Sequence, residues 1–162
     1  MNYFHKVMNP VWYHGHGKKP PFFEGWYFKC VSADESQKWA FIPGIFKNTD
    51  PEKNHCFIQV LDGNKGSACY HRFGHEAFQA KEMAFDVSIG TSHFQIDHIQ
   101  FDIDDEQGKI IGELRFKNQH PWKRTLFAPG VMGPFGWLPF LECYHGICSL
   151  DHSIEGSLNI YG

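Results

Sequence analysis

The stretch Ile99–Phe116, IQFDIDDEQGKIIGELRF, decides the fold class. Its middle part, Asp104–Gly108, is a cluster of turn-forming residues, and apolar residues alternate with polar ones on both sides of it. From Ile110 to Phe116 the even-numbered positions are apolar or glycine, whereas the odd-numbered positions are mostly charged. This period of two predicts a β-hairpin with one face in the core and the other in water.

The same alternation recurs along the chain in both directions from this hairpin. Further strands are expected at residues 24–31, 56–60, 85–89, 94–96, 143–150 and 153–161, the last two joined tightly at Asp151–His152. No apolar pattern with helical spacing is longer than about two turns. Residues 119–139, in which prolines and glycines surround aromatic residues, are expected to form a long ordered loop. We therefore predict a single all-β domain over residues 1–162, an antiparallel barrel or sandwich.

Composition excludes several classes of protein. The net charge is −3 and the basic residues are scattered along the sequence, so a nucleic-acid-binding protein is not expected. No stretch approaches the roughly 20 apolar residues of a membrane-spanning helix, so no integral membrane segment is expected. The first residues lack the continuous apolar block of a secretory signal, which predicts a cytoplasmic location.

The cysteines and histidines predict neither disulfides nor a metal site. The cysteines are odd in number and form no C-x-x-C pair, so we expect free, mostly buried thiols at Cys30, Cys56, Cys69, Cys143 and Cys148. His14 and His16 would share one side of an extended segment, but no further ligands follow at a diagnostic spacing. The sequence also lacks a phosphate-binding glycine loop and a nucleophile elbow, so no cofactor is predicted.

Glu24 is the first candidate for chemistry. The alternation puts it on the same strand face as Trp26 and Phe28. If that face is inward, desolvation raises the pKa of the carboxyl group, and a carboxyl group that is protonated near neutral pH can act as a general acid. The alternative is structural: Glu24 accepts hydrogen bonds from the adjacent loop and fixes the entrance to the strand.

A second polar cluster is expected around the last two strands. It contains Glu142, Tyr144, His145, Asp151, His152 and Glu155, set among apolar residues. A histidine beside a carboxylate can relay a proton or orient a hydroxyl group of a substrate. The alternative is a buried histidine whose hydrogen bonds are all satisfied within the protein.

Several blocks of sequence resemble one known family. The string FFEGWYFK at 22–29 is similar to the opening signature of the tocopherol cyclase family, including its bacterial members. Later blocks also resemble the bacterial branch and occur in the family's order: PW at 121–122, FAPG at 127–130, MGPF at 132–135, ECYHG at 142–146 and LDHSIEG at 150–156. The resemblance covers nearly the whole chain and corresponds to the N-terminal half of the family, whose members usually continue into a second barrel-like half.

This resemblance implies a lipocalin-like fold and, from the plant enzymes, closure of a chromanol ring from a prenylated hydroquinone without an organic cofactor. Glu24 would be the acid, and His145 or Tyr144 would orient the phenolic hydroxyl group. The expected ligand-binding residues are Trp26, Phe28, Trp122, Phe135, Trp137, Glu142, Asp151 and His152. The expected partner is a small apolar ligand of the prenylated quinol type.

Three alternatives to catalysis stay open at the level of the sequence. One is a non-catalytic, lipocalin-like lipid carrier in which the aromatic residues only line a pocket. Another is a half-domain that depends on the missing C-terminal half. The third is a homodimer in which a second copy pairs with an open sheet edge and replaces that half.

Overall fold

The computed structural model describes residues 3–141 and 143–162. Its helical elements are short: α1 (Tyr3–Met8), η1 (Pro51–Lys53), η2 (His75–Ala77) and η3 (Gly133–Trp137). Its strands are β1 (Phe22–Gly25), β2 (Phe28–Val31), β3 (Lys38–Lys47), β4 (His55–Asp62), β5 (Ser67–Gly74), β6 (Phe78–Ala80), β7 (Asp86–Ile89), β8 (Ser92–Gln95), β9 (His98–Asp105), β10 (Gly108–Lys117) and β11 (Ser153–Ile160). The prediction of an all-β fold is confirmed.

The first sheet, sheet A, is built around β3. Its order is β1-β3-β4-β5, and β2 also pairs with β3, beyond β1 along the same edge. The single strand predicted at residues 24–31 is therefore two strands, because the chain leaves the ladder at Trp26 and Tyr27. The Trp26 backbone N–H still donates to the Pro43 carbonyl at 3.0 Å, so the break is bridged. No strand was predicted at β3 or β5, and the structure contains both.

The second sheet, sheet B, is an antiparallel meander in the order β11-β10-β9-β8-β7-β6. The two hairpins predicted from alternation are confirmed, since β7 pairs with β8 and β9 pairs with β10. The inner face of β10 carries Ile110, Leu114 and Phe116, as the sequence pattern predicted.

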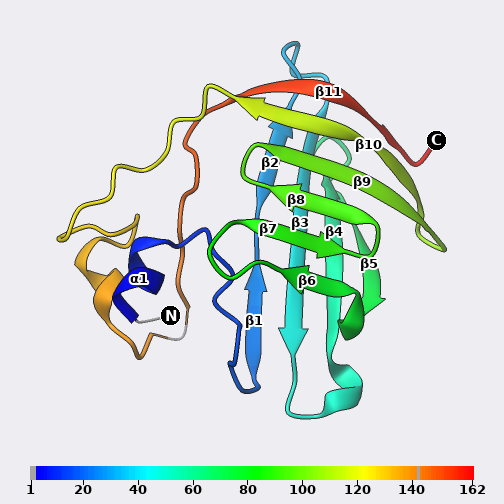
Figure 1. Cartoon of the computed structure of the whole chain (residues 1–162). Helices are drawn as coiled ribbons and strands as arrows, with labels where there is room; N and C mark the ends of the chain where they lie inside the picture. Colours follow the sequence, from blue (N-terminus) through cyan, green and yellow to red (C-terminus); the bar gives the residue numbers. More distant parts are fainter. Residues whose placement is uncertain (1–2, 142) are drawn as a thin grey trace.

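The two sheets pack face to face as a sandwich, and their strands cross at a steep angle (Figure 1). Aromatic residues from both layers fill the space between them. Phe41 of sheet A lies 4.7 Å from Phe101 of sheet B, and Phe101 contacts Phe94 at 5.5 Å, measured between ring centroids. These three rings are almost completely inaccessible to solvent. The core is therefore closely packed with side chains.

The strand predicted at residues 143–150 is wrong. Residues 143–152 run as irregular chain, and β11 pairs with β10 along its whole length, from Lys117↔Ser153 to Ile110↔Ile160. The predicted tight connection at Asp151–His152 is therefore absent, and residues 118–141 and 143–152 belong to a long excursion between two neighbouring strands (Figure 1). The proline- and glycine-rich loop predicted at 119–139 is confirmed, with η3 inside it.

We call α1 together with residues 119–141 the aromatic lobe. The Phe4 and Trp137 rings stack at 5.3 Å, and the Tyr3 hydroxyl group donates to the Trp137 carbonyl at 2.8 Å. Arg124 Nη1 donates to the Met8 carbonyl at 2.6 Å, which ties the loop to the end of α1. The lobe projects from one side of the sandwich (Figure 1). In the described part of the chain, no helix is long and apolar enough to cross a membrane.

Candidate functional site

Glu24 lies on β1 with its side chain largely buried, as the alternation predicted. The N-terminal segment covers the carboxylate: the His14 backbone N–H donates to Oε2 at 2.9 Å and to Oε1 at 3.2 Å, and His14 Nδ1 lies 3.6 Å from Oε1. His14 Nε2 in turn lies 3.2 Å from the Asn9 carbonyl oxygen. Glu24 thus has the contacts expected of the structural alternative, because it fixes the preceding loop to the strand.

The electrostatic environment of Glu24 is unusual for a carboxyl group. Burial raises the pKa of Glu24 to about 7, and the neighbouring backbone N–H groups, Lys6 and Lys47 offset only part of this rise. Burial also lowers the pKa of His14. Near neutral pH the proton of this pair therefore resides on the carboxyl group in a large fraction of molecules. The predicted desolvation is confirmed, whereas the catalytic role of Glu24 stays a prediction.

Trp26 and Phe28 follow Glu24 on the inner side of sheet A, but they belong to the packed core. The Trp26 ring lies 5.2 Å from Phe85, and its indole N–H donates to the Val11 carbonyl at 3.3 Å. Phe28 stacks on Phe116 of sheet B at 5.7 Å. Both residues were expected to contact a ligand. In the structure they contact protein side chains, which fill the space that the ligand would take.

The two residues expected to act with Glu24 lie beside the aromatic lobe. The Tyr144 hydroxyl group donates to the Leu138 carbonyl and accepts from the Leu141 N–H at 3.3 Å. His145 Nε2 lies 3.4 Å from Cys143 Sγ. Among the described residues, no hydrogen bond or ion pair joins either side chain to Glu24. The polar cluster predicted from two paired strands therefore does not form, since the strand that would align it is irregular.

The other predicted ligand-binding residues are also dispersed. Phe135 and Trp137 lie in η3, and the Trp137 indole N–H donates to the Leu126 carbonyl at 2.7 Å. The indole N–H of Trp122 is buried without a hydrogen-bond partner in the described part of the chain. His152 packs edge-on against Phe116 at 4.9 Å. Asp151 is exposed and accepts a backbone hydrogen bond through its carbonyl group, and Glu142 lies outside the described residues.

A groove of about 340 Å³ lies on the outer face of sheet A. A row of three nearly parallel rings crosses it: Phe57 lies 5.9 Å from Phe23 of β1 and 4.9 Å from Tyr70 of β5. Phe23 and Tyr70 are exposed, whereas Phe57 between them is buried. The remaining lining residues are Ile42, Phe46, His55 and Gln59. This is a solvent-facing aromatic surface with a few polar groups.

The groove depends on a glycine and a hydrogen-bonded pair. A Cβ atom at Gly44 would lie 2.4 Å from Phe57 Cζ, so only glycine lets the ring lie flat against β3. At one side His55 Nε2 lies 2.8 Å from the Tyr70 hydroxyl oxygen, and His55 Nδ1 lies 2.8 Å from the Lys53 carbonyl oxygen. The carbonyl group requires N–H at Nδ1, so Nε2 accepts and the Tyr70 hydroxyl group donates.

This groove was not predicted from the sequence. Its rings come from strands whose partners are distant in the sequence, and β3 and β5 were not predicted. One signal was available: Phe23 and Phe57 each occupy the face opposite the apolar inner positions of their strands, which is unusual for large aromatic residues.

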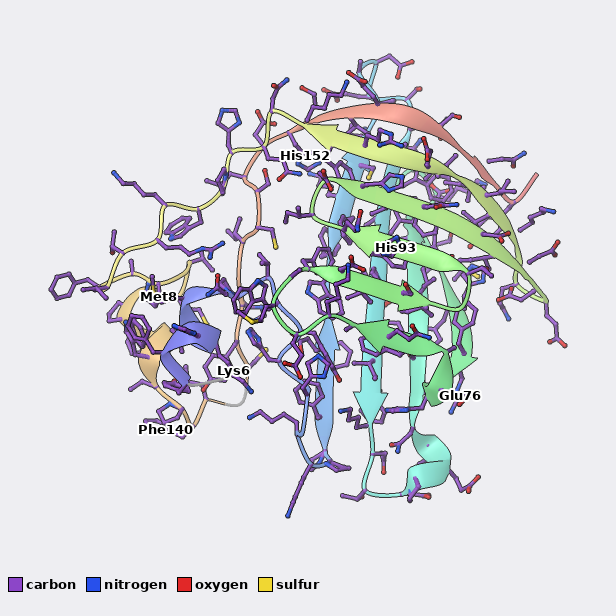
Figure 2. The ribbon with its side chains drawn as sticks, viewed as in Figure 1. Lys6, Met8, Glu76, His93, Phe140 and His152 are labelled. Atoms are coloured by element: carbon purple, nitrogen blue, oxygen red, sulfur yellow. The ribbon has the colours of Figure 1, made fainter. Side chains whose placement is uncertain are left out.

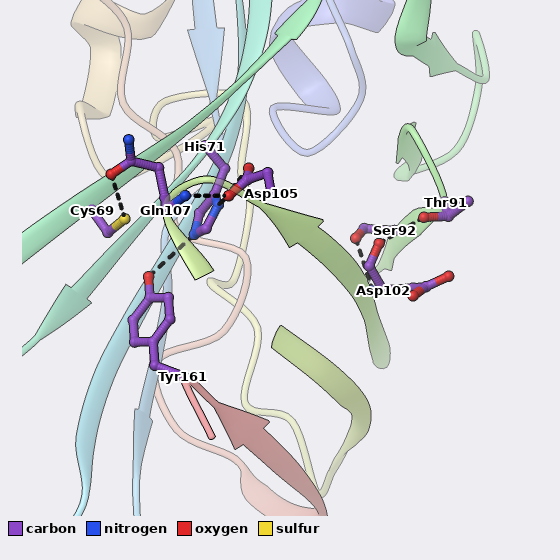
Figure 3. Close-up of polar contacts among 8 residues, drawn as sticks. All are labelled: Cys69, His71, Thr91, Ser92, Asp102, Asp105, Gln107 and Tyr161. Atoms are coloured by element: carbon purple, nitrogen blue, oxygen red, sulfur yellow. Dashed lines mark hydrogen bonds and ion pairs between the residues drawn. The ribbon is translucent and has the colours of Figure 1, made fainter. Parts of the chain in front are cut away.

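A second polar network, which no sequence pattern predicted, joins the two sheets on the inner face of β5, opposite the face that carries Tyr70 (Figure 3). His71 of β5 is fully buried, and its Nδ1 lies 2.8 Å from Asp105 Oδ2 at the end of β9. Its Nε2 lies 3.1 Å from the Tyr161 hydroxyl oxygen, just after β11. The carboxylate fixes N–H at Nδ1, and Tyr161 donates to Nε2. Both ring nitrogens are satisfied, so the network ties the edge strand β5 of sheet A to sheet B.

No known protein family, curated protein or solved structure matches this chain. The resemblance to the tocopherol cyclase family therefore stays a prediction based on the sequence blocks.

Proposed function

We propose that this chain is a tocopherol cyclase-like binding domain that holds an apolar, ring-bearing ligand such as a prenylated quinol in the groove on the outer face of sheet A. The observation that carries the proposal is the row Phe23–Phe57–Tyr70. Its rings offer flat apolar surface on which another ring can stack, and each aromatic contact contributes about 0.5–1.5 kcal/mol beyond the area it buries.

The polar groups at the groove suit a hydroxylated ring. The Tyr70 hydroxyl group donates to His55, so its oxygen can still accept a hydrogen bond from a phenol. Gln59 offers an amide group that can donate or accept. Ile42 and Phe46 supply apolar surface for a prenyl chain. A ligand with an apolar chain and a phenolic ring would therefore satisfy both parts of the groove.

The test is a titration with 2-geranylhydroquinone followed by intrinsic fluorescence. Phe23→Ser should weaken binding at least tenfold, because it removes an exposed stacking surface. Tyr27→Ser is the matched control, since Tyr27 is 63% exposed and Phe23 is 60% exposed, and Tyr27 is not among the residues that line the groove. Equal affinity in both variants would contradict the proposal. Native mass spectrometry of the purified protein would also detect a co-purified lipid and report whether the protein is a monomer or a homodimer.

Ring closure is the second candidate function, and the raised pKa of Glu24 favours it. The Glu24 carboxyl group would protonate the trisubstituted alkene of the prenyl chain, the phenolic oxygen would attack the resulting tertiary cation, and the phenolic proton would return to the carboxylate. Alternation along β1 puts Phe23 and Glu24 on opposite faces of the strand. A ligand stacked on Phe23 would therefore not meet Glu24, which favours the non-catalytic carrier.

A direct assay separates the carrier from the cyclase. Conversion of 2-geranylhydroquinone to its chromanol would be measured for the natural chain and for Glu24→Gln. The carrier proposal expects no turnover in either protein and equal affinity for the quinol. Turnover that disappears in Glu24→Gln, with binding retained, would establish the cyclase instead.

We infer a cytoplasmic location as part of the same proposal. All five cysteines are free thiols, and Cys30 and Cys56 are buried. Unpaired thiols in this number are typical of a reducing compartment.

A further inference from the structure

We propose that the aromatic lobe is a docking surface for an anionic lipid bilayer. The inference is independent of the ligand groove, which lies on sheet A. It rests on three observations: the exposure of the apolar side chains of the lobe, their fixed arrangement, and the charge of the surrounding residues.

The lobe exposes an unusual amount of apolar surface. Phe127 is 85% exposed, Phe140 is 74% exposed, and Leu126 and Phe135 are each more than 60% exposed. Phe140 lies at the outer rim of the lobe, below α1 (Figure 2). Among the described residues of the lobe, no side chain belongs to the hydrophobic core of the sandwich. A segment that exposes this much large apolar side chain is a candidate for a surface that another body covers.

The lobe is held in one arrangement although it lacks a core of its own. The Trp137 indole N–H bonds to the Leu126 carbonyl and the Trp137 ring stacks on Phe4, so the loop, η3 and α1 are linked. Arg124 bonds to the Met8 carbonyl. Burying these apolar groups in a bilayer would thus require little further ordering of the chain, and ordering is one of the main costs of association.

The charge of the lobe indicates that the surface it binds is anionic. The lobe carries Lys6, Lys123 and Arg124 and contains no acidic residue. The chain as a whole has more acidic than basic residues, and the first acidic residue after the lobe is Glu142. The basic residues are scattered in the sequence, but folding brings Arg124 against the end of α1, where Lys6 lies (Figure 2).

This combination matches the chemistry of an interfacial membrane anchor. Basic residues beside exposed Phe and Leu bind anionic headgroups while the apolar side chains enter the acyl boundary. Tryptophan prefers the same interface, and three of the chain's five tryptophans, Trp12, Trp122 and Trp137, lie in or next to the lobe. A neutral protein surface would cover the apolar groups but would offer no anionic partner to Lys6 and Lys123.

Vesicle co-sedimentation tests the proposal. The full chain would be mixed at physiological ionic strength with vesicles of phosphatidylcholine alone and with vesicles in which about a third of the lipid is phosphatidylglycerol. We expect at least tenfold stronger partition to the anionic vesicles. Lys123→Gln should reduce that partition about fivefold, because one basic residue near an anionic membrane surface contributes about 1 kcal/mol of binding free energy. The double variant Phe127→Ser/Phe140→Ser should reduce it at least tenfold.

The controls come from the sandwich. Tyr27→Ser and Lys29→Gln remove an exposed aromatic residue and an exposed lysine of sheet A, outside the lobe, and both should leave partition unchanged. Far-UV circular dichroism would verify that the variants are folded. Absence of partition, or partition that is equal on both kinds of vesicle and insensitive to Lys123→Gln, would overturn the proposal. A dimer that dissociates in Phe127→Ser/Phe140→Ser, without vesicle binding, would overturn it in favour of a second copy of this chain.

Discussion

At the scale of single residues, Glu24 links the stability of the fold to pH. Its carboxyl group has an ordinary pKa of 4.5 in the unfolded chain and a pKa of about 7 in the folded protein. The folded state therefore binds the proton more tightly than the unfolded state. The free energy of unfolding should fall as the pH rises from about 4.5 to about 7 and then level off.

Glu24→Gln should remove this dependence, because glutamine is neutral and its carbonyl group can still accept from the His14 N–H. Relative to Glu24→Gln, the natural chain should lose about 3 kcal/mol of stability between pH 4.5 and pH 8, measured by urea unfolding. The lowered pKa of His14 acts in the opposite direction but is present in both proteins, so it cancels in the comparison. Glu82→Gln, at an exposed position, is the control and should show the same pH dependence as the natural chain.

The His71 network gives a second prediction at this scale. Tyr161→Phe removes the hydroxyl group that donates to His71 Nε2 and leaves a buried acceptor without a partner. We expect a loss of about 1–3 kcal/mol in the free energy of unfolding. Tyr27→Phe, at an exposed position, should change stability by less than about 0.5 kcal/mol. A Tyr161→Phe variant as stable as that control would show that the network contributes nothing.

The residues also show what a single sequence can reveal. The burial of Glu24 was predictable because its neighbours two and four positions later are large and apolar, and this information is local. The triad of His71, Asp105 and Tyr161 was not predictable, since it depends on the approach of β5, β9 and the chain after β11. No periodicity within one strand encodes that approach.

At the scale of elements, the pairing of β10 with β11 depends on two glycines. A Cβ atom at Gly112 would lie 2.3 Å from the Ser157 carbonyl oxygen, and one at Gly156 would lie 2.2 Å from the Glu113 carbonyl oxygen. Both residues have positive φ angles, of 132° and 123°. The two backbones therefore approach more closely than side chains would allow.

Gly112→Ala should destabilise the protein by about 3 kcal/mol or more, because it adds both a steric clash and an unfavourable φ. Gly66→Ala separates these effects, since Gly66 also has a positive φ, of 66°, but has open space around its Cβ position. We expect the control to lose only about 1 kcal/mol. Thermal unfolding of the two variants would measure the difference, and equal losses would contradict a role for close backbone approach.

The elements differ in how far sequence patterns predict them. The hairpins β7–β8 and β9–β10 have one solvent-exposed face, so apolar and polar residues alternate clearly along their strands. β3 was missed because its central run, AFIPGIF, is apolar on both faces and includes Pro43 and Gly44, which argue against a strand. The strand predicted at 143–150 failed for the opposite reason: its alternation is present, but the position beside β10 is taken by β11.

At the scale of the whole molecule, a lipocalin-like protein is expected to bind its ligand in its interior. Here the interior is filled, and the open aromatic surfaces lie on the exterior. Phenylalanine rings fill the space between the sheets, whereas open aromatic surfaces lie on the outer face of sheet A and on the lobe. The family resemblance predicted an internal ligand site, and the packing of the core could not be derived from composition alone. A high aromatic content is compatible with either a filled or a hollow interior.

The register of β10 and β11 makes the excursion between them separable from the rest of the chain. Lys117 and Ser153 are direct partners across the ladder, so their ends are already as close as the two ends of a hairpin turn. A gene in which residues 118–152 are replaced by Asn-Gly should therefore encode a minimal sandwich. The excursion is thus a module that could be removed or transplanted, while the sandwich serves as its scaffold.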